Sequence, residues 1–91
     1  MSWYVYILEC ADDSFYTGIA VDVDARMQAH KDGGGSKYVA SKGFKRLLYV
    51  LEVSSRSEAS KVEYAVKQLE KFEKLVFFRE HDSLVFSAFE Q

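Results

Sequence analysis

The N-terminal residues constrain the fold more than any other part of the chain. Residues 3–10 are rich in aromatic and β-branched side chains, which favour strands. Residues 15–20 have the same character. Residues 11–14, Ala-Asp-Asp-Ser, are typical of a turn, because aspartate tolerates left-handed backbone conformations better than most residues. We therefore expect an antiparallel β-hairpin at the start of the fold.

Helix and strand signals alternate along the next part of the chain. Asp22 is a good N-cap for a helix that runs to about His30 and is ended by the glycines at 33–35. Residues 36–42 favour one short helical segment. Residues 44–53 include five consecutive apolar side chains, which indicates a buried central strand.

The C-terminal half favours helices. Residues 55–58, Ser-Arg-Ser-Glu, fit a capping box before a long helix whose apolar residues recur at helical spacing: Ala59, Val62, Val66 and Leu69. We expect a break near residues 70–72 and a further helical stretch after it. The order strand, strand, helix, strand, helix predicts an α+β fold, in which helices flank a small three-stranded sheet that is mixed or antiparallel.

Tyr6 and Tyr16 stand in the two strands of the predicted hairpin, and the length of the turn decides whether their rings share a face of the sheet. With a two-residue turn, position 6 would oppose position 19, and the two rings would point to opposite faces. A three-residue connection or a β-bulge would bring both rings to one face. If the tyrosines act together, an odd-length turn or a bulge is expected near residues 12–14.

Charge is distributed unevenly along the chain. The 91 residues have a formal net charge of −2, which argues against a broadly basic surface for nucleic acid. Residues 31–46 nevertheless carry five basic side chains against one acidic side chain. Such a segment can contact a short phosphate path of a few nucleotides, or it can simply be solvated. Composition alone leaves both interpretations open.

Composition also bears on the location of the protein. No segment approaches the roughly 20 apolar residues of a transmembrane helix, and no basic leader precedes an apolar run. Cys10, the single cysteine, has no partner for an internal disulfide and is interpreted as a small buried side chain rather than a catalytic thiol. We expect one cytoplasmic domain without membrane association.

Five short motifs follow one another between residues 3 and 76. In chain order they are Tyr4-Val5-Tyr6, Tyr16-Thr17-Gly18, Arg26 followed four residues later by His30, Ser36-Lys37-Tyr38, and a helical segment that carries Glu63. Together they resemble the GIY-YIG endonuclease superfamily, most closely its small stand-alone bacterial members. Tyr4 replaces the glycine that names the first motif, and Thr17 replaces the isoleucine of the second, but both motif tyrosines remain.

The resemblance implies a metal-dependent DNA endonuclease. It suggests one Mg²⁺ or Mn²⁺ ion held mainly by Glu63. Tyr6 is the expected general base, helped by His30 or Tyr16, and Arg26 is expected to neutralise charge on the phosphate. An unperturbed phenol has a pKa near ~10, so this role for Tyr6 requires a nearby cation that lowers the pKa.

The resemblance also suggests how DNA is bound. Lys37, Tyr38 and Lys42 are expected to contact the nucleic-acid backbone or to stack on a base. So small a domain favours recognition of single-stranded or branched DNA over recognition of sequence, which would suit DNA repair or recombination. The alternative is a catalytically silent module on the same fold that binds nucleic acid or another protein.

Each candidate residue also has a purely structural interpretation. The two tyrosines can pack against each other across the strands, and the arginine and histidine can form an exposed pair on a solvated helix face. Glu63 can form an ion pair with Lys67, four residues later on the same helix.

The C-terminus carries a separate apolar signal. We expect a nuclease domain at residues 1–78 and a C-terminal extension at residues 79–91. The extension contains four large apolar side chains close together: Leu84, Val85, Phe86 and Phe89. We expect it to pack on the domain as an added edge strand or a covering helix; the alternative is that it docks a protein partner or a second copy of the chain.

Overall fold

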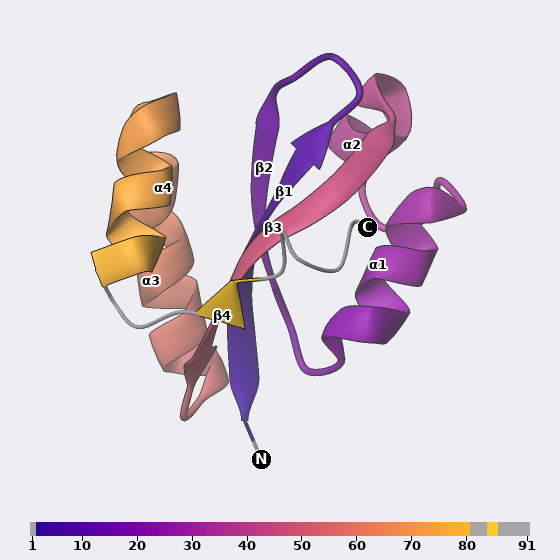
Figure 1. Cartoon of the computed structure of the whole chain (residues 1–91). Coiled ribbons are helices and arrows are strands. Elements are labelled where there is room, and N and C mark those ends of the chain that lie inside the picture. The colour runs from indigo at the N-terminus through magenta and orange to yellow at the C-terminus, as the bar shows by residue number, and fades with distance from the viewer. Residues whose placement is uncertain (1, 81–83, 86–91) are drawn as a thin grey trace.

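The computed structural model describes residues 2–80 and 84–85. Its elements are, in chain order, β1 (Trp3–Cys10), β2 (Phe15–Ala20), α1 (Val23–Lys31), α2 (Lys37–Lys42), β3 (Phe44–Val53), α3 (Arg56–Lys67), α4 (Lys71–Glu80) and β4 (Leu84–Val85). The strands form one antiparallel sheet with the spatial order β2-β1-β3-β4 (Figure 1). The predicted α+β fold is confirmed, and its three principal strands begin and end at the predicted residues.

Side-chain caps explain where three of the helices begin. The side chains of Asp22, Ser36 and Ser55 each accept a hydrogen bond from the backbone N–H three residues later, at the starts of α1, α2 and α3. Each cap satisfies one of the N–H groups that the first turn of a helix leaves without a partner. The carboxylate of Glu58 accepts a hydrogen bond from the backbone N–H of Ser54. In a capping box it would accept from the N-cap residue, Ser55, so the predicted capping box is present with a shift of one residue.

The turn between β1 and β2 is a three-residue connection. Cys10 N donates to Ser14 O at 2.8 Å, which leaves residues 11–13 as the loop. Asp13 has a φ of 70°, in the left-handed region that closes hairpins of this length. From the start of α4, Lys71 Nζ donates to the carbonyl oxygen of Asp13 at 2.6 Å.

This turn sets the register that matters for function. Tyr6 opposes Gly18, and Leu8 opposes Tyr16. Side chains alternate along each strand, so both tyrosine rings lie on the same face of the hairpin. The predicted odd-length turn is confirmed.

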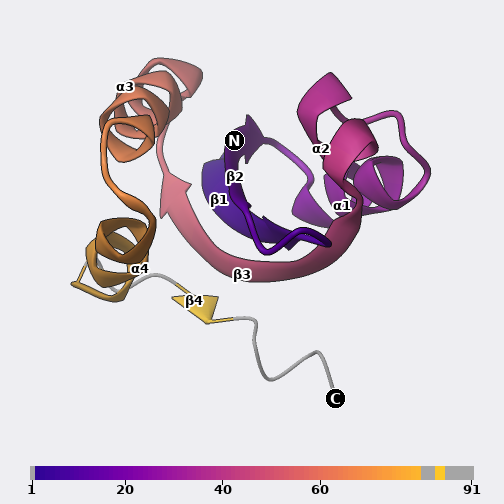
Figure 2. The ribbon, with the colours of Figure 1, turned by 90° about the horizontal axis from the view of Figure 1, so that it is seen from above.

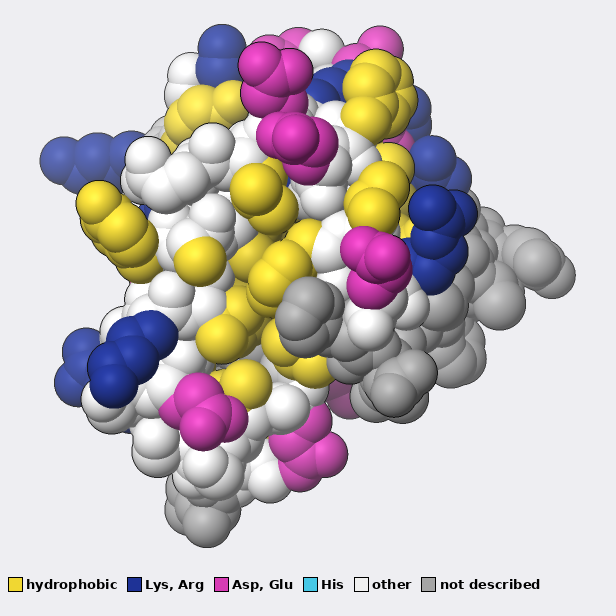
Figure 3. Space-filling model, turned by 90° about the vertical axis from the view of Figure 1, so that its left-hand side faces the viewer, with side chains coloured by type: hydrophobic (Ala, Val, Ile, Leu, Met, Phe, Trp, Pro, Cys, Tyr) yellow, Lys and Arg dark blue, Asp and Glu magenta, His cyan; other side chains and the backbone are white. Residues whose placement is uncertain are grey.

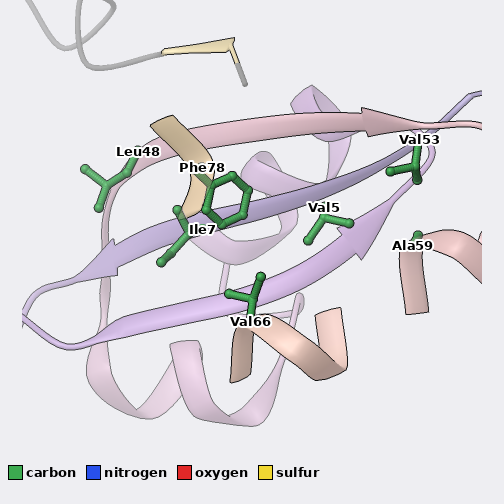
Figure 4. Packing of buried hydrophobic residues seen from close by; sticks show 7 residues of the cluster. All are labelled: Val5, Ile7, Leu48, Val53, Ala59, Val66 and Phe78. Atoms are coloured by element: carbon green, nitrogen blue, oxygen red, sulfur yellow. The ribbon is translucent and has the colours of Figure 1, made fainter. Parts of the chain in front are cut away.

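Helices cover both faces of the sheet (Figure 2). On one face, Val5 and Ile7 of β1 form a buried cluster with residues of α3 and α4, which Figure 4 shows. On the other face, Tyr6 and Leu8 cluster with buried residues of α1 and α2. The candidate catalytic tyrosines therefore belong to the α1 and α2 face.

The core continues to the end of the predicted domain. Phe78 in α4 is completely buried and stacks on Tyr49, with ring centroids 6.0 Å apart. Beyond it, Leu84 and Val85 pair with β3 as a short edge strand. The rest of the predicted extension, residues 81–83 and 86–91, lies outside the described residues, so its packing on the domain stays a prediction.

The outer surface of α4 carries exposed apolar side chains. Phe72 is 74% exposed and Val76 is 40% exposed. They line an open groove with Leu69 and Phe77, and the acidic side chains of Glu73 and Glu80 also border it. Figure 3 shows the apolar stripe on the face formed by α3 and α4.

None of the helices in the described part of the chain is long and apolar enough to cross a bilayer.

Candidate active site

Tyr6 lies at the centre of the site. It is completely buried in the middle of β1, and its Oη is 2.8 Å from Nε2 of His30. The opposite strand makes room for the phenol because Gly18 has no side chain: a Cβ at that position would lie 2.4 Å from Tyr6 Oη. The glycine of the Tyr16-Thr17-Gly18 motif is therefore required by close packing and not by its backbone conformation.

His30 is held among aromatic rings at the end of α1. Its side chain is 2% exposed and meets the rings of Tyr6 and Tyr16 edge-on, at centroid distances of 5.8 and 5.6 Å. Phe44 stacks on the imidazole at 6.5 Å. Gly35 also makes room for this ring, since a Cβ there would lie 2.3 Å from Nδ1. The expected alternative, an exposed Arg26–His30 pair, is wrong for His30.

Burial also determines the protonation of His30. Desolvation, helped by the positive charge of Arg26, lowers the pKa of His30 below its ordinary value, so the ring is neutral at pH 7. Among the described residues, Nδ1 has no hydrogen-bond partner. A buried N–H without an acceptor is rarer than a buried acceptor without a donor. We therefore assign the proton to Nε2, which donates it to the oxygen of Tyr6.

Burial is the main influence on the pKa of Tyr6. Burial raises the pKa of Tyr6 to about 12, and the electrostatic interaction with Tyr16 also raises it. Arg26 opposes this rise through its positive charge and a hydrogen bond. Glu63 adds a smaller upward contribution. At pH 7 a phenol with this pKa is ionised in only about one molecule in 10⁵. Arg26 alone therefore does not lower the pKa of Tyr6 enough for the base role, and a further cation is still required.

Arg26 lies at the exposed mouth of the site. It precedes His30 by one turn of α1, so both residues face the same side of the helix, as predicted. Its Nη1 also donates to the carbonyl oxygen of Ile19 at 3.4 Å. The guanidinium is thus close to Tyr6 and still accessible to an anion from solvent.

Tyr16 and Tyr38 form a stacked pair beside this centre. Their ring centroids are 5.8 Å apart and their planes differ by 24°. Tyr38 is 43% exposed, and the ammonium of Lys42 lies 5.9 Å from its centroid. Lys37 is exposed at the first position of α2. The structure thus brings Tyr38 next to Tyr16, with Lys42 on the ring of Tyr38.

Glu63 approaches from the other layer of the molecule. Its helix, α3, packs on the face of the sheet opposite α1 but also contacts the edge strand β2. The side chain of Glu63 is 24% exposed, and Lys67 Nζ lies 3.4 Å from its Oε2. The ion pair considered as the structural alternative is therefore present. Lys67 also lies 5.9 Å from the centroid of Tyr16.

The residues present fit a divalent ion whose ligand shell is completed by water and substrate. No cluster of three or more His, Cys, Asp or Glu side chains occurs in the described part of the chain, so a cage made of protein ligands alone is not available there. Mg²⁺ commonly binds one or two carboxylates and completes its shell with water and substrate phosphate. The single carboxylate of Glu63 fits that pattern, with the nucleic acid supplying further oxygens.

The basic segment at residues 31–46 is largely neutralised. Lys42 lies 3.5 Å from the carboxylate of Asp12, and Lys45 lies 3.2 Å from that of Asp13. Arg46 Nε donates to Glu9 at 2.7 Å. The acidic hairpin tip therefore faces the basic segment, and the local surplus of positive charge available to a phosphate backbone is smaller than the sequence suggests.

Sequence reasoning missed three residues that shape the site: Gly18, Gly35 and Phe44. Gly18 is the last residue of the Tyr16-Thr17-Gly18 motif, so the sequence carried a signal for this position although its packing role was not predicted. Phe44 lies 14 residues from His30 in sequence, and only the tertiary fold brings it to the imidazole. Lys67 was expected beside Glu63, but its contact with the ring of Tyr16 also depends on the tertiary fold.

Comparison with known proteins agrees with this geometry. A sequence model described as the GIY-YIG catalytic domain matches residues 2–76. The UPF0213 protein OB0043 of Oceanobacillus iheyensis is 47% identical over 72 residues, covering 79% of this chain and 84% of that protein. The UPF0213 protein YhbQ of Escherichia coli is 44% identical over 72 residues, covering 79% of this chain and 72% of that protein.

A solved structure shows the same fold. The solution NMR structure of the UPF0213 protein BH0048 from Bacillus halodurans has a TM-score of 0.53 and 44% sequence identity, and covers 85% of this chain and 82% of that one. The family match spans more than half of the chain, and the relatives are well above 30% identical. The chain therefore belongs to the GIY-YIG family, a nuclease superfamily, together with the small single-domain UPF0213 proteins of bacteria.

Proposed function

We propose that this protein is a divalent-metal-dependent DNA endonuclease that selects single-stranded or branched DNA. One observation carries the proposal: the buried Tyr6–His30 hydrogen bond, at 2.8 Å, lies in a niche that two glycines leave open. Arg26 and Glu63 both act electrostatically on the same phenol. Family membership supports the reaction class, and a cytoplasmic role in DNA repair or recombination would follow from it.

In this proposal the residues of the chain divide the work of hydrolysis. Arg26, exposed at the mouth of the site, binds the scissile phosphate and neutralises charge as it develops. Tyr6 first loses its own proton to solvent, and the resulting phenolate accepts a proton from the attacking water, with Tyr16 beside it. His30 donates from Nε2 to the Tyr6 oxygen, so it stabilises the phenolate and holds the ring, and does not itself take the proton.

Glu63 would hold the metal ion. Mg²⁺ or Mn²⁺ bound there supplies positive charge to the phosphate oxygens and the leaving oxygen. The pKa of about 12 makes additional positive charge near Tyr6 necessary for the base role, because Arg26 alone leaves the phenol protonated. Since Glu63 is a single carboxylate, metal binding should be much tighter in the presence of DNA than in its absence.

The choice of substrate follows from the surface around the site. The exposed ring of Tyr38, stacked on Tyr16 and accompanied by Lys42, is a platform for an unpaired base. Lys37 at the start of α2 adds a contact to the backbone. The neutralised basic segment and the net charge of −2 disfavour binding along a long duplex.

The proposal is tested with the purified protein and labelled single-stranded, duplex, flap and junction DNA, each with Mg²⁺, Mn²⁺ or EDTA. Single-stranded RNA of the same sequence tests the sugar preference. Cleavage of single-stranded or branched DNA that requires the metal and disappears in Glu63→Gln supports the proposal. Cleavage that persists in EDTA or in Glu63→Gln would refute the metal role of this residue.

The second candidate is a catalytically silent nucleic-acid-binding module. The observation in its favour is that Lys67 already neutralises the carboxylate of Glu63. This reading predicts binding of single strands without cleavage under every metal condition, and equal binding by wild type and Glu63→Gln. The same assay therefore separates the two candidates.

A further inference from the structure

Lys67 occupies the space between the candidate metal ligand and the second tyrosine. It lies one helical turn after Glu63, with Nζ 3.4 Å from Glu63 Oε2 and 5.9 Å from the centroid of Tyr16. The side chain of Lys67 is 49% exposed, so its ammonium group is open to solvent on one side. A cation is thus already placed at the carboxylate that the metal would use.

The ion pair between Lys67 and Glu63 is weak enough to be broken by a competing cation. Ion pairs between half-exposed side chains one helical turn apart are weak. Lys74 on α4 is close enough for the two ammonium groups to repel each other, as the lowered pKa of Lys74 indicates, although burial is its larger cause. Lysine has a flexible four-carbon stem and three donors that can be redirected without moving the backbone.

We propose that Lys67 is a placeholder that moves during substrate binding. Before binding, it neutralises Glu63; when a divalent cation takes the carboxylate, Lys67 turns its ammonium group to a phosphate oxygen of the nucleic acid. A dication and an ammonium in contact with one carboxylate repel each other, whereas a phosphate beside Tyr16 offers the ammonium a new partner. This inference rests on the proposed function, because it requires Glu63 to be the metal ligand.

If Lys67 moves in this way, it weakens the binding of the metal ion alone and strengthens the binding of DNA in the presence of the metal. Replacing it by methionine keeps an unbranched apolar stem and removes the charge. Because two unit charges about 4 Å apart interact by about 1 kcal/mol in water, Lys67→Met should bind Mn²⁺ about fivefold more tightly than wild type in the absence of DNA. The same change should weaken DNA binding in the presence of the metal and reduce its salt dependence by about one counterion.

Metal binding is measured by titrating ¹⁵N-labelled protein with Mn²⁺ and following the paramagnetic broadening of the amide signals of residues 62–64. The matched control is Lys61→Met, which removes an exposed lysine from the same helix. Glu63→Gln should abolish the local broadening, and only Lys67→Met should strengthen it. Equal Mn²⁺ affinity in wild type and Lys67→Met, or equal strengthening in Lys61→Met, overturns the exchange while the metal site stands. Broadening that persists in Glu63→Gln overturns the metal site itself.

DNA binding supplies the second readout. Fluorescence anisotropy with a labelled single strand is measured in Mg²⁺ and in EDTA, in a Tyr6→Phe background that prevents cleavage. Lys67→Met should lower affinity in Mg²⁺ and leave it unchanged in EDTA, because without metal Lys67 stays paired with Glu63. An equal loss in both conditions would identify Lys67 as an ordinary backbone contact and overturn the coupling to the metal.

Discussion

Gly18→Ala is expected to damage both the stability and the activity of this protein. The added Cβ would lie 2.4 Å from Oη and 2.6 Å from Cζ of Tyr6, closer than van der Waals contact permits. Tyr6 is completely buried and hydrogen-bonded to His30, so its ring has no free space to retreat into. Gly18 does not have a left-handed backbone, so alanine at this position is disfavoured by the contact alone.

The magnitude follows from three effects. Overpacking in a buried site costs about 1–3 kcal/mol. Disturbing the hydrogen bond between Tyr6 and His30 adds about 1 kcal/mol. The smaller conformational entropy of alanine in the unfolded chain offsets roughly 0.5–1 kcal/mol. A net loss of about 2 kcal/mol should lower the Tm of a domain of this size by about 8–16 °C.

The cleavage rate of Gly18→Ala should also fall, even at temperatures where the variant is fully folded. A shift of about 1 Å in a catalytic group can lower the rate about 10²-fold, so cleavage at a temperature where Gly18→Ala is folded should drop by about that factor. Thermal denaturation and single-turnover cleavage measure the two effects. Gly34→Ala is the matched control, because the nearest atom to its Cβ, Ala29 O, is 3.9 Å away. A Gly18→Ala variant with the Tm and rate of Gly34→Ala would refute the packing argument.

Three further predictions concern single residues. Glu63→Ala should abolish metal-dependent cleavage while thermal denaturation shows an intact fold, because its proposed role lies in transition-state stabilisation; full activity would exclude Glu63 as the ligand. Burial lowers the pKa of His30, so its contribution to stability is complete above about pH 6.5 and is lost as the pH falls; the Tm should therefore drop between pH 7.5 and 5.5 by more in wild type than in His30→Gln, and equal drops would contradict this. Asp13→Gly should relieve about 1–2 kcal/mol of left-handed strain, and the larger entropy of glycine in the unfolded chain offsets roughly 0.5–1 kcal/mol of that gain. The ion pair with Lys45 is exposed, so a net gain of about 0.5–1 kcal/mol should raise the Tm by roughly 2–8 °C; a lower Tm would show that this pair matters more.

Local signals explain why so much of the fold could be predicted. Strand and helix boundaries depend on neighbouring residues, such as the caps at Asp22 and Ser55 and the aspartates of the hairpin turn. The shared face of Tyr6 and Tyr16 also follows from local geometry, because turn length fixes register. These features need no knowledge of tertiary contacts.

The electrostatics of the site could not be predicted in the same way. The raised pKa of Tyr6 depends on its removal from water, which the packing of α1 and α2 against the sheet decides. The neutralisation of the basic segment depends on pairs such as Arg46–Glu9, 37 residues apart in sequence. Residue type gives the sign of each charge, but the partner of each charge is set by the fold.

The burial of Phe78 has a consequence for how the chain folds during synthesis. Phe78 belongs to the same cluster as Val5 and Ile7, so the core joins residues from nearly opposite ends of the described chain. Contacts of such long sequence separation form late, after a large loop has closed. A nascent chain that has not yet released α4 from the ribosome therefore exposes the part of this apolar face that α4 covers. Such a chain can complete its core only after translation has passed α4, and until then its exposed apolar surface favours association with other chains.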